Sequence, residues 1–126
     1  MQTPYLVAAI LAALTGLVHS VLGEILIFRH LRDGSLVPAL GAPPLRERNV
    51  RIIWATWHLA TLFGWAFAGV LLQLALGHPL SASLVTGAIV FAYLGGAVLV
   101  LVGTKGRHPG WVALTAVAAL TAASAP

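Results

Sequence analysis

Long apolar stretches alternate with short polar segments along the whole chain. The apolar stretches cover about residues 4–29, 50–75, 80–103 and 109–124, and the last of them is the shortest. A helix needs roughly 17 to 25 apolar residues to cross a bilayer. The pattern therefore predicts an all-α integral membrane protein, a single domain over residues 1–126 in which four transmembrane helices form an up-down-up-down bundle.

Within the first stretch, residue size and polarity repeat with the period of an α-helix. At about 100° per residue, Glu24 shares one arc with small or polar side chains. These are Ser20, Gly16, Gly23, His19, Ala13, Ala12 and Ala9. Large apolar side chains occupy the opposite arc: Leu11, Leu14, Val18, Val21, Leu22, Ile25 and Phe28. Small residues let helices approach closely in a membrane, so we predict that the first arc faces other helices and the second faces lipid.

The second and third stretches divide in the same way. On the second, His58 shares a face with Trp54, Thr61, Trp65, Arg51, Leu62 and Gly69. On the third, small residues gather on one side, as close helix packing requires: Ala88, Ala92, Gly95, Gly96 and Gly103. We therefore expect the first two stretches to carry the polar site, and the other two to serve packing.

The composition agrees with a membrane location. Hydrophobic residues make up 60% of the 126 residues, and only three side chains are acidic. These proportions exclude a soluble domain of ordinary surface composition. The chain has no cysteine, which excludes disulfides, thiolate metal sites and cysteine redox chemistry.

The basic residues are confined to two of the three predicted connections. All seven lie in or beside the first or the third: Arg29, Arg32, Arg46, Arg48, Arg51, Lys105 and Arg107. The positive-inside rule then predicts a multi-pass membrane protein with these connections in the cytoplasm and both termini non-cytoplasmic. The same cations suit anionic lipid headgroups, at roughly 1 kcal/mol each. We expect no nucleic-acid binding, because neither connection interleaves aromatic and basic residues.

The first connection, about residues 30–49, is long for a link between two helices. It contains residues that disfavour continued helix: Gly34, Pro38, Gly41, Pro43 and Pro44. Its apolar middle suits either of two arrangements. One is a mobile loop anchored by arginines, and the other is a lid folded over the cytoplasmic end of the helices.

Glu24 and His58 are the ionisable side chains that most need a partner. At a rise of ~1.5 Å per residue, Glu24 lies about 7 Å below Arg29 and His58 about 10 Å below Arg51, so their depths match. The first two helices are neighbours by connectivity, and a hydrogen bond between these groups is the least costly way to bury either. We therefore predict a Glu24–His58 pair near the cytoplasmic leaflet. His19 lies about a turn deeper and joins only if both residues border one cavity.

The first predicted function is the binding of a metal ion, cofactor or small ligand at this intramembrane site. Two imidazoles and a carboxylate are a common ligand set for zinc or non-haem iron. The predicted metal ligands are Glu24, His58 and His19, with His108 at the cytoplasmic rim. The residues predicted to contact a ligand are Trp54, Trp65, Thr61, Arg51 and Ser20. Haem or a quinone is an alternative cofactor, and an open metal position would permit catalysis.

Two other functions stay open. The Glu24–His58 pair suits proton exchange, and the length, four predicted helices and a glutamate in the first helix resemble the small multidrug resistance exporters, which implies proton-coupled export. In that family the glutamate is in mid-membrane and the charge bias is weak, whereas Glu24 is near the cytoplasmic end and the bias here is complete. In the other alternative, the polar groups only hold helices together in an accessory or scaffold subunit of a larger membrane complex, or in a homo-oligomer.

Overall fold

The computed structural model describes residues 1–124, and its regular elements in that range are helices, with one isolated β-bridge between Ala42 and Leu45. The helices are α1 (Thr3–Leu26), the short 3-10 helix η1 (Phe28–Leu31), α2 (Glu47–Ala75), α3 (Ala82–Thr104) and α4 (Gly110–Ala123). The predicted all-α class is therefore confirmed. The predicted helix boundaries agree to within a few residues, with α1 ending three residues earlier than expected and α2 beginning three residues earlier.

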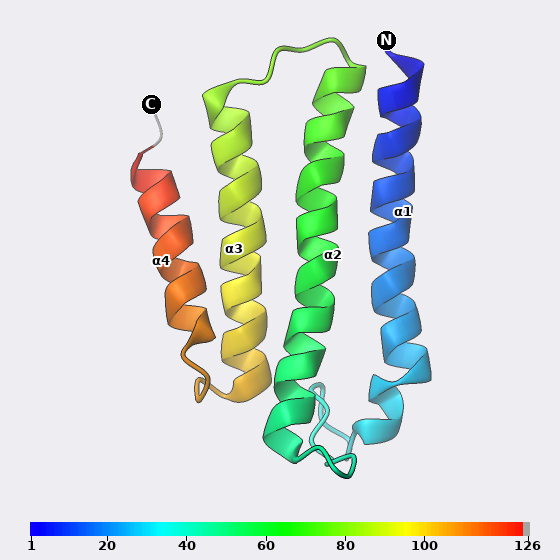
Figure 1. Cartoon of the computed structure of the whole chain (residues 1–126), viewed down its shortest axis with the longest axis vertical. Helices are drawn as coiled ribbons and strands as arrows, with labels where there is room; N and C mark the ends of the chain where they lie inside the picture. The colour runs from blue at the N-terminus through cyan, green and yellow to red at the C-terminus, as the bar shows by residue number, and fades with distance from the viewer. Residues whose placement is uncertain (125–126) are drawn as a thin grey trace.

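The four helices stand side by side in a row (Figure 1). Extensive packing within residues 1–124 joins only helices that follow each other in sequence, α1 with α2, α2 with α3 and α3 with α4. Neighbours run in opposite directions, and the start of α1 lies at the same end of the row as the end of α4 (Figure 1). The alternating directions agree with the prediction, but a bundle closed around a common centre is not what is observed. Lipid covers apolar helices as well as protein does, so nothing requires the row to close.

Three of the helices are long and apolar enough to cross a membrane: α1 with 24 residues, α2 with 29 and α3 with 23. These helices are typical of a membrane protein. Helix α4 has 14 residues, which gives about 21 Å at ~1.5 Å per residue, below the roughly 30 Å of a hydrocarbon core. The predicted fourth span is therefore too short to cross a bilayer by itself.

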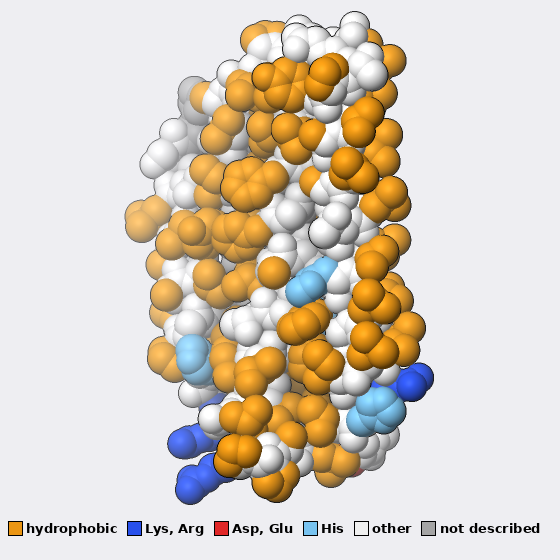
Figure 2. Space-filling view, turned by 45° about the vertical axis from the view of Figure 1, so that its right-hand side comes forward, with side chains coloured by type: hydrophobic (Ala, Val, Ile, Leu, Met, Phe, Trp, Pro, Cys, Tyr) orange, Lys and Arg blue, Asp and Glu red, His pale blue; other side chains and the backbone are white. Residues whose placement is uncertain are grey.

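In α1 the arc of small and polar residues is the buried one and the arc of large apolar residues is the exposed one, as predicted. On the Glu24 side, Ala9, Gly16 and Gly23 are buried, while the opposite large residues from Leu11 to Ile25 are exposed. Figure 2 shows hydrophobic side chains along the length of this side of the molecule and Lys or Arg at one end. Phe28 is the exception, because only 1% of it is exposed. The chain leaves the α-helix at Ile27 (φ −122°, ψ −68°) and turns Phe28 inward.

The glycines of α3 let α2 approach closely. A Cβ atom placed on Gly96 would stand 2.2 Å from Leu59 Cδ1, and one on Gly95 would stand 2.8 Å from Leu62 Cδ1. Both distances are shorter than van der Waals contact, so these leucines occupy the space that a side chain would need. The small-residue side of α3 is therefore a packing surface, as predicted.

The first connection folds over one end of the helices. Val37 is buried, and Pro38 is among the residues with less than 2% exposure. Val37 packs in a cluster with Phe28, Trp54, Ala55 and Val100. The backbone of the connection is also fixed, since the carbonyl of Leu31 accepts from the N–H groups of Ala39 (2.9 Å) and Leu40 (3.0 Å). This arrangement matches the lid rather than the mobile loop, and it brings Arg32 against the end of α1.

Candidate functional site

Glu24 lies between α1 and α2 with a partner on each carboxylate oxygen. Its Oε1 accepts a hydrogen bond from Trp54 Nε1 at 2.7 Å and lies 2.9 Å from His58 Nε2. Its Oε2 forms an ion pair with Arg32 Nη2. The predicted contact between Glu24 and His58 is therefore confirmed. Each carboxylate oxygen therefore has a partner, and one of the three partners comes from the first connection.

His58 continues this polar contact along the helices, away from Arg32. Its Nδ1 lies 2.8 Å from Ser20 Oγ, which in turn lies 2.8 Å from Thr61 Oγ1. Thr61, of which 4% is exposed, donates to the backbone carbonyl of Gly16 at 3.0 Å. Glu24, His58, Ser20 and Thr61 thus form a continuous hydrogen-bonded cluster within the α1–α2 interface, hereafter the Glu24 cluster.

Two tryptophans of α2 also donate to the backbone of α1. Trp57 Nε1 donates to the carbonyl of His19 at 3.0 Å, and Trp65 Nε1 donates to that of Ala13 at 3.1 Å. Together with Thr61 they are spaced four residues apart, about one turn of α2. Side-chain donors at this spacing connect α2 to α1 over most of the buried face. An indole N–H group usually has a hydrogen-bond acceptor when it is buried, and the α1 carbonyls provide these acceptors.

His19 belongs to this set of contacts and not to the Glu24 cluster. Its Nε2 lies 3.2 Å from the Trp57 carbonyl, and its ring stacks on the Trp57 indole with centroids 4.4 Å apart and planes inclined by 7°. Within residues 1–124, no three His, Asp or Glu side chains gather where they could hold a metal ion. The predicted zinc or iron site is therefore not supported. Glu24 is engaged by Arg32 and Trp54, and His19 by Trp57, instead.

A second polar site lies at the basic end of the row, in a cavity of about 590 Å³. It opens between the first turns of α2 and the end of α3 with the α3–α4 connection. Its lining consists of Glu47, Arg48, Asn49, Arg51, Ile52, Thr104, Lys105, Arg107 and His108. Four of these residues are cationic and one is acidic. We refer to this feature as the basic cavity.

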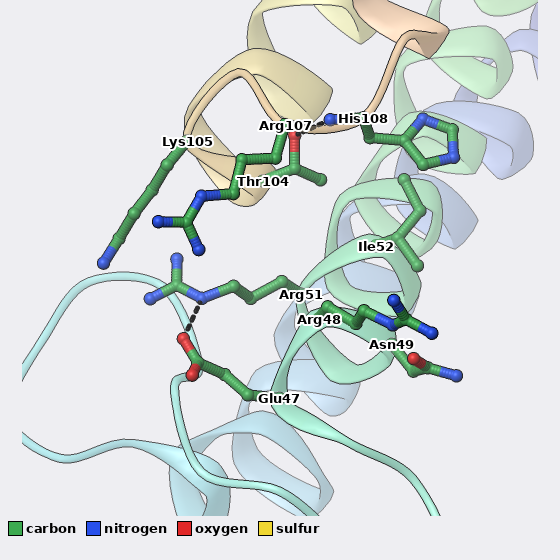
Figure 3. A pocket seen from close by; sticks show the side chains of 9 residues that line it. All are labelled: Glu47, Arg48, Asn49, Arg51, Ile52, Thr104, Lys105, Arg107 and His108. Atoms are coloured by element: carbon green, nitrogen blue, oxygen red, sulfur yellow. Dashed lines mark hydrogen bonds and ion pairs between the residues drawn. The ribbon is translucent and has the colours of Figure 1, made fainter.

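Arg51 is the buried member of the basic cavity, with 8% of its side chain exposed. Its Nε donates to Glu47 Oε1 at 2.8 Å, and its Nη1 donates to the Gly103 carbonyl at 3.0 Å. Figure 3 shows the Arg107 guanidinium and the Lys105 side chain on the same side of the cavity as the Arg51 guanidinium, while Arg48 extends away from them. Three cationic groups therefore converge beside a single carboxylate.

A smaller cavity of about 360 Å³ adjoins this site and shares Glu47, Arg51 and Lys105 with it. Asp33 of the first connection also lines it. The hydroxyl of Ser35 donates to Asp33 Oδ1 at 2.9 Å. This hydrogen bond is the main reason that the pKa of the Asp33 carboxyl is lowered, and a backbone hydrogen bond acts in the same direction.

The residues predicted as one site therefore divide between three places. The structure brings together Glu24, His58, Ser20, Thr61 and Trp54. It places His19 and Trp65 in the backbone contacts between α1 and α2. It places Arg51 and His108 in the basic cavity, where His108 Nδ1 accepts from the Gly110 N–H at 3.0 Å. The separation follows from Arg51 lying about two turns before His58 in α2.

Sequence reasoning did not assign Arg32 to Glu24, nor Glu47 and Thr104 to a site. It assigned Lys105 and Arg107 only to lipid headgroups, together with the other cations. The Glu47–Arg51 ion pair could have been predicted from the sequence, since Glu and Arg four residues apart on a helix lie on the same face. The contact of Arg32 could not, because its position depends on the end of α1 at Leu26 and on the fold of the connection.

No protein-family model, curated protein or solved structure matches this chain. The resemblance to small multidrug resistance exporters therefore stays a prediction.

Proposed function

We propose that the protein is a small multi-pass membrane protein that binds an anionic, phosphate-bearing ligand in the basic cavity. The observation that carries this proposal is the convergence of Arg51, Lys105 and Arg107 beside one carboxylate in a cavity of about 590 Å³. Small-molecule sites have volumes of roughly 300 to 1,000 Å³. A small-ligand function was the first prediction from the sequence, and the proposal moves it from the Glu24 cluster to this cavity.

The charges of the cavity favour an anion. Within residues 1–124, the one ion pair made by its four cations is that between Arg51 and Glu47. Cations held close together repel each other, and a bound anion relieves that repulsion. Guanidinium groups also match phosphate oxygens in geometry, since two parallel N–H groups can donate to two oxygens. The arginines of the basic cavity therefore suit a phosphate group better than a halide ion.

The location favours a ligand at the membrane surface. The basic cavity lies where α2 begins and α3 ends, so it is at the end of two spans. We propose that this end faces the cytoplasm and that both termini are non-cytoplasmic, because all seven cations of the chain lie in or beside the two connections at this end. An anionic lipid headgroup and a soluble phosphate compound would both present the required group.

The test compares ligand binding in the wild type and in two charge-matched variants. The purified protein is titrated with phosphatidylglycerol in zwitterionic detergent micelles, and separately with pyrophosphate, while its thermal unfolding midpoint is followed. Removing one cation at the membrane surface costs roughly 1 kcal/mol of anion binding, so Arg107→Gln should weaken binding about fivefold. Arg46→Gln removes the same charge at an exposed residue outside the cavity lining, and it should leave binding nearly unchanged.

The two probes identify the source of the phosphate. Stabilisation by phosphatidylglycerol alone indicates a lipid headgroup, and saturable stabilisation by pyrophosphate indicates a soluble ligand. Equal weakening by Arg107→Gln and Arg46→Gln would contradict the proposal, because it would mean that the ligand responds to net charge and not to the cavity. Stabilisation by neither probe would also contradict it.

The short fourth helix favours a second candidate function, that of an accessory subunit. Helix α4 has 14 residues, and within residues 1–124 its extensive packing is against α3 alone. A helix shorter than the hydrocarbon thickness is accommodated by bilayer thinning or by association with other helices. This candidate predicts that the protein co-purifies with a stoichiometric membrane partner, or with a second copy, after cross-linking in the native membrane. Recovery as a stable monomer would contradict it.

A further inference from the structure

The Glu24 cluster contains a chain of donors and acceptors in which each hydroxyl has one proton to give. The chain runs from Glu24 Oε1 to His58 Nε2 (2.9 Å), and from His58 Nδ1 to Ser20 Oγ (2.8 Å). It continues to Thr61 Oγ1 (2.8 Å) and ends at the Gly16 carbonyl (3.0 Å). These distances allow two arrangements of the protons, which differ in whether Thr61 donates to the Gly16 carbonyl or to Ser20.

In the first arrangement His58 is doubly protonated. Thr61 donates its one proton to the Gly16 carbonyl, so its oxygen accepts from Ser20. The Ser20 proton is then used, and Ser20 Oγ accepts from an N–H at His58 Nδ1. On the other side of the ring, the Glu24 carboxylate is ion-paired with Arg32 and accepts from an N–H at Nε2. In this arrangement His58 is an imidazolium.

Loss of one proton from the ring reverses the direction of the hydrogen bonds from His58 Nδ1 to Thr61. The N–H bond at Nδ1 breaks, the proton passes to water, and no electrons are exchanged. The remaining ring proton stays on Nε2, opposite the carboxylate. Nδ1 then accepts from the Ser20 hydroxyl, and Ser20 Oγ accepts from Thr61. The Gly16 carbonyl thereby loses its hydrogen bond from α2. Of the two ionisable side chains, Glu24 is the more exposed, at 31% compared with 15% for His58.

We propose that the Glu24 cluster is a proton-binding site, in which one proton taken up by His58 sets the hydrogen bond between α2 and the backbone of α1. Ser20 and Thr61 are positioning residues, because they determine whether Nδ1 of the ring donates or accepts. The charged groups that face His58 are Glu24 of α1 and, through Glu24, Arg32 of the first connection. The proposal is independent of ligand binding in the basic cavity.

The other neighbours of His58 add no further charge. Trp54 and Phe28 contribute uncharged rings, with centroids 5.1 Å and 6.1 Å from that of His58. His19 is engaged with Trp57. Helix α3 has Tyr93 as its titratable side chain, and this residue packs on Phe63. The protonation of His58 is therefore governed by the Glu24–Arg32 pair on one side and by the two hydroxyls on the other.

The test measures ring protonation directly in the full-length protein in nanodiscs. Nitrogen-15 NMR of labelled histidine distinguishes doubly from singly protonated rings, and His58→Gln identifies the signal among the five histidines. We expect wild-type His58 to be doubly protonated at acidic pH and to lose one proton as the pH rises. In Thr61→Val, Ser20 is free to donate to Nδ1, so the ratio of doubly to singly protonated His58 at a fixed pH should fall about tenfold.

Two controls separate this effect from a general loss of structure. Thr61→Ser keeps the hydroxyl and should keep the ratio within about twofold of the wild type. Thr56→Val makes the same change at an exposed residue of α2 whose hydroxyl donates within its own helix, and should not change the ratio. Ser20→Ala removes the acceptor of the Nδ1 proton and provides the test if Thr61→Val does not fold. An unchanged ratio in a folded Thr61→Val or Ser20→Ala protein would overturn the proposal, as would an equal fall in Thr56→Val.

Discussion

Single glycines decide how closely α2 approaches α1. At Gly23 a Cβ atom would stand 2.2 Å from Trp57 Nε1, and at Gly16 it would stand 2.9 Å from Trp65 Nε1. Both indoles donate to the backbone of α1, so they reach their acceptors only because these positions carry no side chain. The glycines of α1 are therefore part of the polar contact and not only of the apolar packing.

Gly23→Ala should consequently destabilise the protein. The added methyl group displaces the Trp57 indole, which weakens its hydrogen bond to the His19 carbonyl and its stacking on the His19 ring. Overpacking of this kind costs about 1–3 kcal/mol, measurable as a lower free energy of unfolding in mixed micelles. Gly64→Ala is the matched control in α2, because nothing lies within 4 Å of its Cβ position. It should be neutral or stabilising by up to about 1 kcal/mol. Equal effects at both glycines would show that helix propensity, and not packing, governs the result.

The Glu24–His58 pair could be predicted from its residues, because an ionisable side chain in an apolar segment needs a polar partner. Glu24 and His58 each need a partner in an apolar segment, and helical rise and connectivity put both at one depth. His19 was assigned to the same site because it shares the small and polar arc of the first helix and lies about a turn deeper, on the condition that both residues border one cavity. Its actual partner is a backbone carbonyl beside the Trp57 ring. Backbone acceptors are present at every position of a sequence, so no pattern distinguishes the one that a histidine will use.

At the scale of elements, the first connection is a packed part of the fold. Val37 lies in the cluster that contains Phe28 and Trp54, which places the connection over the end of α1 and α2. Its composition was ambiguous, since apolar residues between prolines suit a surface loop or a lid equally. Contacts with residues distant in sequence decide between these, and they follow from Phe28 turning inward after Ile27.

Disrupting this packing should expose the connection to proteolysis. Val37→Asp places a carboxylate in a site of which 7% is exposed, and a buried unpaired charge costs several kcal/mol. We expect the first connection of Val37→Asp to be cleaved at least tenfold faster by a limiting amount of protease in nanodiscs. The control is Leu36→Asp at the adjacent residue, of which 73% is exposed, and its cleavage rate should resemble that of the wild type. Equally fast cleavage of both variants would indicate that the connection is mobile and not packed.

For the whole molecule, the row of helices is the feature that the sequence did not predict. A closed bundle and a row make the same demand on each helix, namely one side of small residues and one of large ones. In water the exposed apolar faces of a row would drive closure, but in lipid they are already covered. Helices α3 and α4 are almost uniformly apolar, so no polar side chain indicates which of their faces should meet a partner. The arrangement is set by shape, such as the fit of Leu59 against Gly96.

The proposed orientation of the row in the membrane is based on charge and can be tested by single-cysteine labelling, because the chain has no cysteine of its own. All seven cations lie in or beside the first and third connections, and connections rich in lysine and arginine are retained in the cytoplasm during insertion. Leu80→Cys places a thiol in the connection between α2 and α3, and Leu36→Cys places one in the first connection; both residues are exposed, by 46% and 73%. In sealed vesicles with the outer surface outward, a membrane-impermeant maleimide should modify Leu80→Cys at once and Leu36→Cys only after permeabilisation. The reverse order would mean that the basic cavity faces outward, and equal reaction of both would mean that the protein inserts in two orientations.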